Sequence, residues 1–248
     1  MLSTLKKYNQ TIIIALAAII ITLFAYLTPP GNLSGYLPGS FLFRELKGDL
    51  PEYVSRFLLS LLLFGIIPIT YIKISRLNFS AVGLKRANTN PLKDRLFPFL
   101  ILLCLVVGTT SAFDQSLSEF YPYSKTLTIL ATDQKWLSFL IHVMSYILFY
   151  YLPWEIFFRG FLIIPFLPDS ESGENEITPG LLLIASFQVI PSSIIHFGHP
   201  ITETLGAIPF GILCGWLVLK YRSIIPGLIL HIITGVTMDL IITIKSGL

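Results

Sequence analysis

Charged residues are scarce in this sequence. Only 12% of its 248 residues are Asp, Glu, Lys or Arg, whereas a soluble globular domain has about 25%. The hydrophobic share is 54%, and runs such as Leu58 to Ile67 contain no charge at all. This scarcity excludes an ordinary soluble domain. It indicates membrane-spanning segments, each of which needs about 20 mostly apolar residues.

Cysteine is also rare, and its placement excludes a structural zinc site. The two cysteines, Cys104 and Cys214, lie in apolar stretches, without a CxxC motif or a Cys/His cluster. Free cysteines of this kind are usually small buried core residues. The net charge of +3 is small and implies no nucleic-acid partner. The chain has no internal repeat, although a small transporter would be expected to have two similar halves.

The apolar runs also lack the alternation of transmembrane strands, and a lipid-exposed backbone must satisfy its own hydrogen bonds, which leaves helices. We therefore predict an all-α, polytopic transmembrane helical bundle with about seven spans. An eighth arises if Pro153 divides the fourth span into two crossings. We divide the chain into an N-terminal three-span region (1–113), an external loop (114–135) and a helical core (136–244). The predicted spans are 11–28, 53–73, 97–113, 136–167, 180–195, 204–219 and 224–244.

Basic residues set the predicted orientation, because cytoplasmic loops carry an excess of Lys and Arg. Lys6 and Lys7 precede the first span, and the loop 74–96 holds five basic residues and one acid. Both are therefore expected in the cytoplasm, the first apolar run being a retained span because no small-x-small cleavage site follows it. Lys220 and Arg222 share that side only if 136–167 is a single crossing, which favours seven spans. We expect an integral protein of the plasma (inner) membrane, surrounded by lipid.

Ionisable residues occur inside the apolar segments of the C-terminal half. Each costs about 2.5–3.5 kcal/mol to insert and usually marks a functional site. Glu155 and Arg159 are four residues apart, so they share a helical face and are expected to pair. His231 and Asp239 also share a face, whereas His142 has no polar neighbour in the sequence and is interpreted as structural. The candidate site residues are Glu155, Arg159, His196, Glu203 and His231.

These residues support several chemistries. One Glu and two His on separate helices could converge on a water, with the Glu as base and the His residues supporting the oxyanion. The same groups could bind a divalent metal or relay protons in a transporter. Glu203 could instead be an acid at a helix start, where it favours the helix dipole. Of the two neighbouring histidines we favour His196, because His199 precedes Pro200 and is expected in an exposed loop.

The order of four short motifs resembles a known family. The motifs are Glu155-x-x-x-Arg159-Gly160, His196-Phe197-Gly198, Gly211-x-x-x-Gly215, and Ser223-Ile224-Ile225-Pro226-Gly227 running into His231. Together they resemble the CAAX prenyl endopeptidase and bacteriocin-processing family, over about 136–244. That family has the patterns Glu-Glu-x-x-x-Arg, Phe-x-x-x-His and His-x-x-x-Asn/Asp. This sequence departs from them at Trp154, Ser192 and Gly235, which stand at the first Glu, the Phe and the Asn/Asp positions.

The resemblance implies an intramembrane peptidase that cleaves a membrane-associated peptide or protein with Glu/His-activated water. In the family the first Glu activates the water; here either Glu155, at the matching motif, or Glu203 would do so, and we slightly favour Glu155. No cofactor is expected, although the same groups leave a divalent metal open. The alternative, favoured by the missing Glu and Asn, is a catalytically silent membrane protein of the same fold. Such a protein would act as an immunity factor or a partner-binding scaffold.

Overall fold

The computed structural model describes residues 2–28, 46, 48–122, 124–129, 135–167 and 177–246, and within them it is helical, with no β-strand. The side chains of Lys6 and Lys7 lie outside the described part, as do residues 123 and 130–134 of the predicted external loop. The all-α prediction is confirmed.

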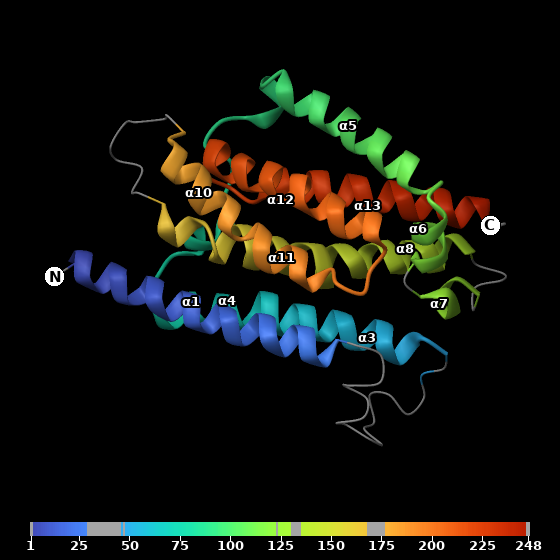
Figure 1. Cartoon of the computed structure of the whole chain (residues 1–248), viewed down its shortest axis with the longest axis horizontal. Helices are drawn as coiled ribbons and strands as arrows, with labels where there is room; N and C mark the ends of the chain where they lie inside the picture. Colours follow the sequence, from blue (N-terminus) through green and yellow to red (C-terminus); the bar gives the residue numbers. More distant parts are fainter. Residues whose placement is uncertain are drawn as a thin grey trace.

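Apolar helical segments run back and forth along the long axis of the molecule (Figure 1). The N-terminal part contains α1 (Leu2–Leu27), then α3 (Leu50–Leu59), η1 (Ser60–Ile66) and α4 (Ile67–Ile74) in succession, and then α5 (Leu96–Ser111). The C-terminal part contains α8 (Lys135–Tyr146), η4 (Ile147–Tyr151), α9 (Leu152–Glu155), η5 (Ile156–Phe161), α10 (Pro179–Phe187), α11 (Val189–Ile195), α12 (Ile201–Tyr221) and α13 (Ile225–Lys245). Short helical pieces connect them: η2 (Phe79–Val82), η3 (Pro91–Lys93), α6 (Gln115–Phe120), α7 (Lys125–Ile129) and η6 (Ile164–Phe166).

Five of these segments are long and apolar enough to cross a membrane. They are Asn9–Leu27, Leu50–Ile74, Trp136–Phe166, Ile201–Tyr221 and Ile225–Lys245. The apolar helices Leu96–Ser111 and Pro179–Ile195 are shorter. Large apolar side chains remain exposed along the outer helices, for example Ile19 at 57% on α1 and Leu102 at 58% on α5. A surface of this kind is stable only against lipid, and the chain is an integral membrane protein.

Pro153 does not break the fourth segment. Residues Trp136–Phe166 form one helical segment of 31 residues. Pro153 occupies the start of α9, and π-helical turns lie on both sides of it (η4 and η5). A proline removes one backbone hydrogen bond and crowds the preceding turn, and wider π-helical turns can absorb that change. The segment therefore continues through Pro153 as one helical segment, and the seven-span count stays a prediction.

The loop 74–96 and the turn between α12 and α13 meet at the same end of the bundle. The backbone N–H of Asn88 donates to the Tyr221 carbonyl at 3.0 Å, and the Ser223 hydroxyl donates to the Lys85 carbonyl at 2.7 Å. Asp94 forms an ion pair with Lys220. The Lys220 side chain, followed by the backbone N–H of Leu96, lowers the pKa of Asp94 to about 2. We call this end the basic end.

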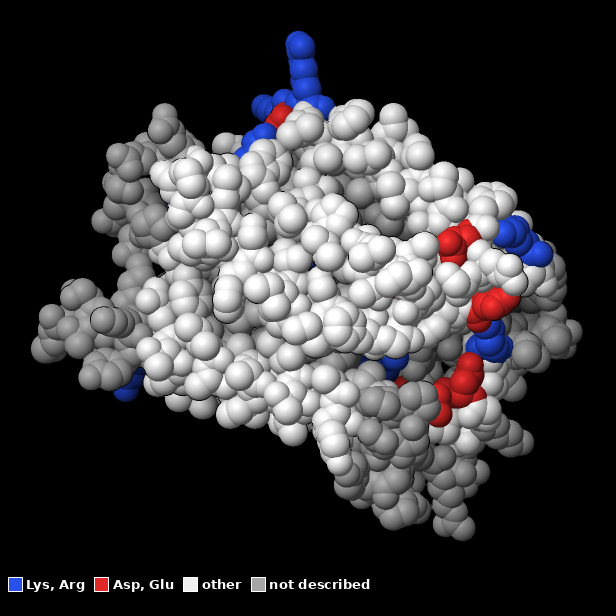
Figure 2. Space-filling model, in the orientation of Figure 1, with Lys and Arg blue, Asp and Glu red and all other residues white. Residues whose placement is uncertain are grey.

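The other end of the bundle is held by a second set of contacts. Asp49 accepts hydrogen bonds from the Ser124 hydroxyl at 3.0 Å and from the backbone N–H of Lys125 at 2.6 Å. Lys245, at the end of α13, donates to the Ala112 carbonyl at 2.8 Å. Between the two ends, the face shown in Figure 2 carries little charge, and its Lys, Arg, Asp and Glu gather at the edges. This pattern is expected of a bundle whose middle lies in hydrocarbon.

Aromatic packing fixes the fourth segment in the centre of the bundle. Phe64 of η1 stacks on Phe157 at 4.9 Å between ring centroids and meets Trp154 edge to face at 5.6 Å. Gly160 lies so close to the Val82 carbonyl that a larger residue would collide with it. Both cysteines are buried and free, as predicted. The central helix is thus held by close packing on several sides.

His142 has polar partners in space that its sequence neighbours do not supply, and these contacts suit the structural role predicted for it. Its Nε2 lies 3.0 Å from Asp239 Oδ2, and its Nδ1 lies 3.1 Å from the Tyr53 hydroxyl. The partners come from α3 and α13, which sequence spacing alone could not bring to α8. Asp239 therefore pairs with His142 and not with His231, although Asp239 and His231 both lie on α13.

Candidate functional site

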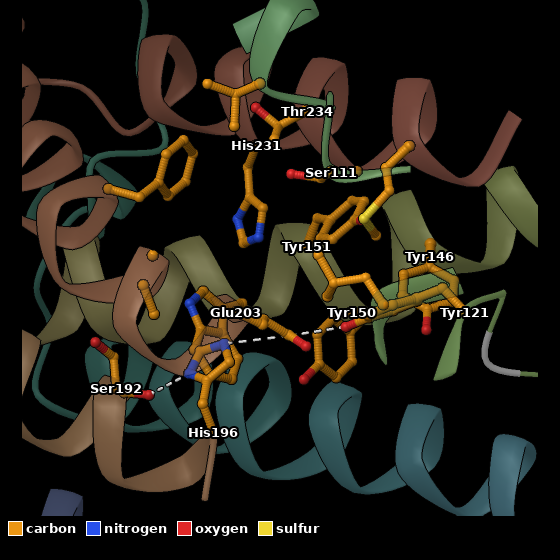
Figure 3. Close-up of a pocket in the computed structure, with 18 of the residues that line it drawn as sticks. Ser111, Tyr121, Tyr146, Tyr150, Tyr151, Ser192, His196, Glu203, His231 and Thr234 are labelled. Carbon is orange, nitrogen blue, oxygen red and sulfur yellow. Dashed lines mark hydrogen bonds and ion pairs between the residues drawn. The ribbon is translucent and has the colours of Figure 1, made fainter. Parts of the chain in front are cut away.

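A cavity of about 230 Å³ lies inside the bundle. Four of the predicted site residues line it: Arg159, His196, Glu203 and His231. Figure 3 shows His231 reaching into it from one side and His196 from the other, with Glu203 between them. The cavity thus brings together residues of the C-terminal segments that are far apart in the sequence. Arg56, Val107 and Ser111 of the N-terminal region also contribute to its wall.

His196 is oriented by the backbone of its own helix. Its Nδ1 lies 2.6 Å from the Ser192 carbonyl, to which it donates, so Nε2 is directed elsewhere. That Nε2 lies 3.8 Å from Glu203 Oε1 (Figure 3). Ser192 stands at the family's Phe position, but the atom that holds His196 is a main-chain oxygen. The change of side chain at Ser192 therefore leaves the orientation of His196 intact.

Glu203 gathers further partners that the sequence analysis did not identify. The Tyr121 hydroxyl donates to Glu203 Oε1 at 2.7 Å, and His199 Nδ1 lies 3.0 Å from the same oxygen. His199 in turn lies 3.1 Å from an Arg56 terminal nitrogen. The expectation that His199 is loop-exposed was wrong, since its side chain is only 10% exposed. The i to i+4 spacing of His199 and Glu203 was a signal for their pairing, whereas nothing local pointed to Tyr121 or Arg56.

Glu155 lies behind His231 and does not line the cavity. It is fully buried, and its Oε1 lies 2.9 Å from His231 Nδ1. The predicted pair with Arg159 is confirmed, with Oε2 3.5 Å from the Arg159 Nε. Gly227 permits this arrangement, because a β-carbon there would lie 3.2 Å from Glu155 Oε2. Glu155 can therefore influence the cavity through the orientation and charge of His231.

Aromatic side chains occupy the space at the other two positions that depart from the family pattern, Trp154 and Gly235. Trp154, at the first Glu position, meets the His196 ring edge to face at 5.3 Å and stacks on Tyr150 at 5.7 Å. Gly235, at the Asn/Asp position, has no room for a side chain, because the Tyr151 hydroxyl occupies the place of its β-carbon. The Tyr151 ring lies 4.5 Å from that of His231. Tyr151 thus places a hydroxyl where the family pattern has a polar side chain.

Among the described residues, no cluster of three or more His, Cys, Asp or Glu side chains is arranged to hold a metal ion. Pairs such as His199 and Glu203 are already engaged with each other. The metal-free reading of the site stays a prediction, and a chelator tests it.

Comparison with known proteins agrees with the motifs. The sequence model of the family described as type II CAAX prenyl endopeptidase Rce1-like matches residues 127–237. No curated protein and no solved structure matches the chain. The matched region is a little under half of the chain, and it contains all five predicted site residues together with Gly235. Over residues 127–237, therefore, this membrane protein is similar to the Rce1-like type II CAAX prenyl endopeptidase family.

Proposed function

We propose that this chain is an intramembrane peptidase that hydrolyses a bond of a membrane-associated peptide or protein inside the cavity. The observation that carries the proposal is that Glu203, His196 and His231 line one cavity from three separate elements. Glu203 lies in α12, His196 follows α11, and His231 lies in α13. An acid and two imidazoles around one space supply the base and the oxyanion support that peptide hydrolysis requires.

In this proposal Glu203 activates the water. A water beside Glu203 and His196 Nε2 gives its proton to the carboxylate while its oxygen attacks the peptide carbonyl carbon. The new C–O bond forms and the carbonyl oxygen takes the negative charge. When the tetrahedral intermediate collapses, the C–N bond breaks and the proton held by Glu203 passes to the leaving nitrogen. Glu203 is favoured over Glu155 for this role because it borders the cavity and Glu155 does not.

His231 and Tyr151 would stabilise the oxyanion. His231 Nδ1 lies 2.9 Å from Glu155 Oε1, and this contact orients the imidazole so that, in the proposal, Nε2 donates to the oxyanion. Tyr151 would add a hydroxyl donor in the space that Gly235 leaves open. Arg159 would balance the charge of Glu155 from the other side. The family's Asn/Asp would thus be replaced by a tyrosine from a different helix.

The decisive experiment measures turnover of a mixed peptide library by the purified protein in lipid nanodiscs, with products identified by mass spectrometry. Glu203→Gln should lower turnover by roughly 10²–10⁴-fold, the usual contribution of a general base. The matched control is Glu119→Gln, because Glu119 lies outside the cavity and accepts a hydrogen bond from Gln115 at the surface of the protein. If Glu155→Gln abolishes turnover and Glu203→Gln does not, the base is Glu155. Full activity in both variants would eliminate the catalytic proposal.

The alternative is a catalytically silent membrane protein of the same fold. Trp154 favours it, since this bulky ring occupies the family's first Glu position and presses on His196. Such a protein, acting as an immunity factor or a partner-binding scaffold, would retain a partner on an affinity column but cleave nothing. Under this alternative the parent protein has no peptidase activity, and the Trp154→Glu variant would acquire it. Under the peptidase proposal, the parent protein itself is active.

A further inference from the structure

Most of the cavity lies in one half of the bundle, and its innermost lining residues, Arg159 and His231, lie past the middle of their helices. Its lining residues on α12 run from Thr202 to Phe210 and thus cover about 12 Å of a helix roughly 31 Å long. On α5, which runs the opposite way, the lining residues Val107 and Ser111 belong to the last third. Arg56 lies in the first turns of the second segment. These positions on α12, α5 and the second segment lie in the half away from the basic end.

The cavity is closed toward the basic end by apolar packing. Phe97, Leu100 and Cys104 of α5 form one buried cluster with Leu217 and Tyr221 of α12. These residues lie at the start of α5 and at the end of α12, next to the loop 74–96. Side chains of the two helices therefore meet there, and this packing closes the gap between α5 and α12 on the basic side of the cavity.

In the other half of the bundle, α5 and α12 border the cavity instead of packing on each other. Val107 is 44% exposed, and Thr202 and Gly206 are exposed as well, although all three line the cavity. A β-carbon added at Gly206 would meet no atom within 4 Å. The cavity thus has an opening on the flank of the bundle, between the last third of α5 and the first half of α12.

The charges assign this opening to one side of the membrane. The basic end carries Arg76, Lys85, Arg86, Lys93 and Arg95 against a single acid, and the turn between α12 and α13 adds Lys220 and Arg222 at the same end. The other end carries Lys125 and Lys245 together with Asp49, Asp114 and Glu119, so among the described residues it has fewer basic side chains than the basic end. Because the Lys/Arg-rich side of a membrane protein lies in the cytoplasm, the half that contains most of the cavity lies in the outer leaflet.

We infer that the cavity takes its substrate from the non-cytoplasmic side: an exported or membrane-anchored polypeptide whose scissile segment enters between α5 and α12. The inference rests on the proposed function for the cleavage itself, but the side of entry follows from the opening and the charges alone. It excludes substrates whose scissile segment stays in the cytoplasm. The opening reaches the lipid-facing flank, so a segment next to a membrane anchor can enter without leaving the bilayer.

Sidedness is tested by cysteine labelling in intact cells that express the full chain. The native Cys104 and Cys214 are buried and are replaced by alanine. Ser116→Cys and Thr202→Cys, both at exposed positions near the cavity, should react with an impermeant maleimide added from outside. Asn88→Cys, exposed in the basic loop, should react only after the cells are opened. Labelling of Asn88→Cys from outside would overturn the inference, whether or not the protein is a peptidase.

Entry is tested with two membrane-anchored reporters that carry the same cleavable peptide on opposite sides of the membrane. Only the reporter with the peptide outside should be cut, and Gly206→Trp should lower its cleavage at least tenfold. Ile212→Trp is the matched control, because Ile212 is exposed on the same helix but does not line the cavity. Cleavage of the inner reporter, or full cleavage by Gly206→Trp, contradicts the entry route. If neither reporter is cut, the proposed function fails and the labelling result still decides the side.

Discussion

Removing the charge of Arg159 should destabilise the protein strongly. Arg159 and Glu155 are 3% and 0% exposed at their side chains, and the Arg159 Nε lies 3.5 Å from Glu155 Oε2. Breaking a buried ion pair on one side leaves an uncompensated buried charge, at a cost of about 3–5 kcal/mol. In Arg159→Leu the carboxylate of Glu155 keeps His231 as a partner at 2.9 Å. We therefore expect the lower end of that range, about 3 kcal/mol.

The measurement is a thermal melt of the purified protein in one detergent. For a chain of this size, 1 kcal/mol corresponds to about 2–4 °C in Tm, so Arg159→Leu should melt roughly 6–12 °C lower. The control is Arg86→Leu, which removes the same charge from an exposed position at the basic end; surface changes of this kind stay within about 0.5 kcal/mol.

A double variant separates charge from packing. Arg159→Leu combined with Glu155→Gln removes both charges, so the uncompensated carboxylate disappears and part of the lost stability should return. If Arg159→Leu melts like the parent, the two charges do not depend on each other, and the role given to Arg159 is wrong.

Further outcomes follow from the same geometry. Tyr151→Phe should lower turnover about 10²–10³-fold, the usual effect of losing one oxyanion donor, while the melting temperature stays near that of the parent. Gly235→Ala should destabilise the fold, because its new methyl group meets the Tyr151 hydroxyl; an unchanged melt would show that Tyr151 can move aside. The pKa of Asp94 is lowered from 3.8 to about 2, so its contribution to stability is present above pH 4 and is lost as the pH falls through about 2. The melting temperature measured as a function of pH should show that loss in the parent protein. The Asp94→Asn variant should not show it. Turnover should survive a chelator; loss of activity that zinc restores would overturn the metal-free prediction.

Hydropathy and charge placement predicted the fold closely, because membrane insertion imposes strong and local rules. Apolar length identified the helices, and the basic residues of the loop 74–96 and of Lys220 and Arg222 correctly placed these two segments at one end. Pro153 left the number of crossings open. The sequence could not show that π-helical turns on both sides would carry the helix through it.

The site was harder to predict, because its pairings join distant segments. The spacing of Glu155 and Arg159 is local, and their pairing was predicted. The bonds of His231 to Glu155 and of Tyr121 to Glu203 span 76 and 82 residues, respectively. Sequence periodicity cannot predict contacts over such separations, and the same holds for His142, since its partner Asp239 lies 97 residues away.

The loss of the first Glu need not remove an acid from the cavity. An acid is useful to His196 if its carboxylate approaches Nε2, and the helix that supplies it is immaterial to the chemistry. Glu203 meets this condition, because its Oε1 lies 3.8 Å from His196 Nε2. Trp154, at the family's first Glu position, instead packs its ring against the His196 ring. The same holds at Gly235, which stands at the family's Asn/Asp position. The polar group there is the Tyr151 hydroxyl, which comes from another helix. Two departures that weaken the family motifs in the sequence are thus each matched in space by a group of similar chemistry. This is why the cavity, more than the motifs, supports a peptidase.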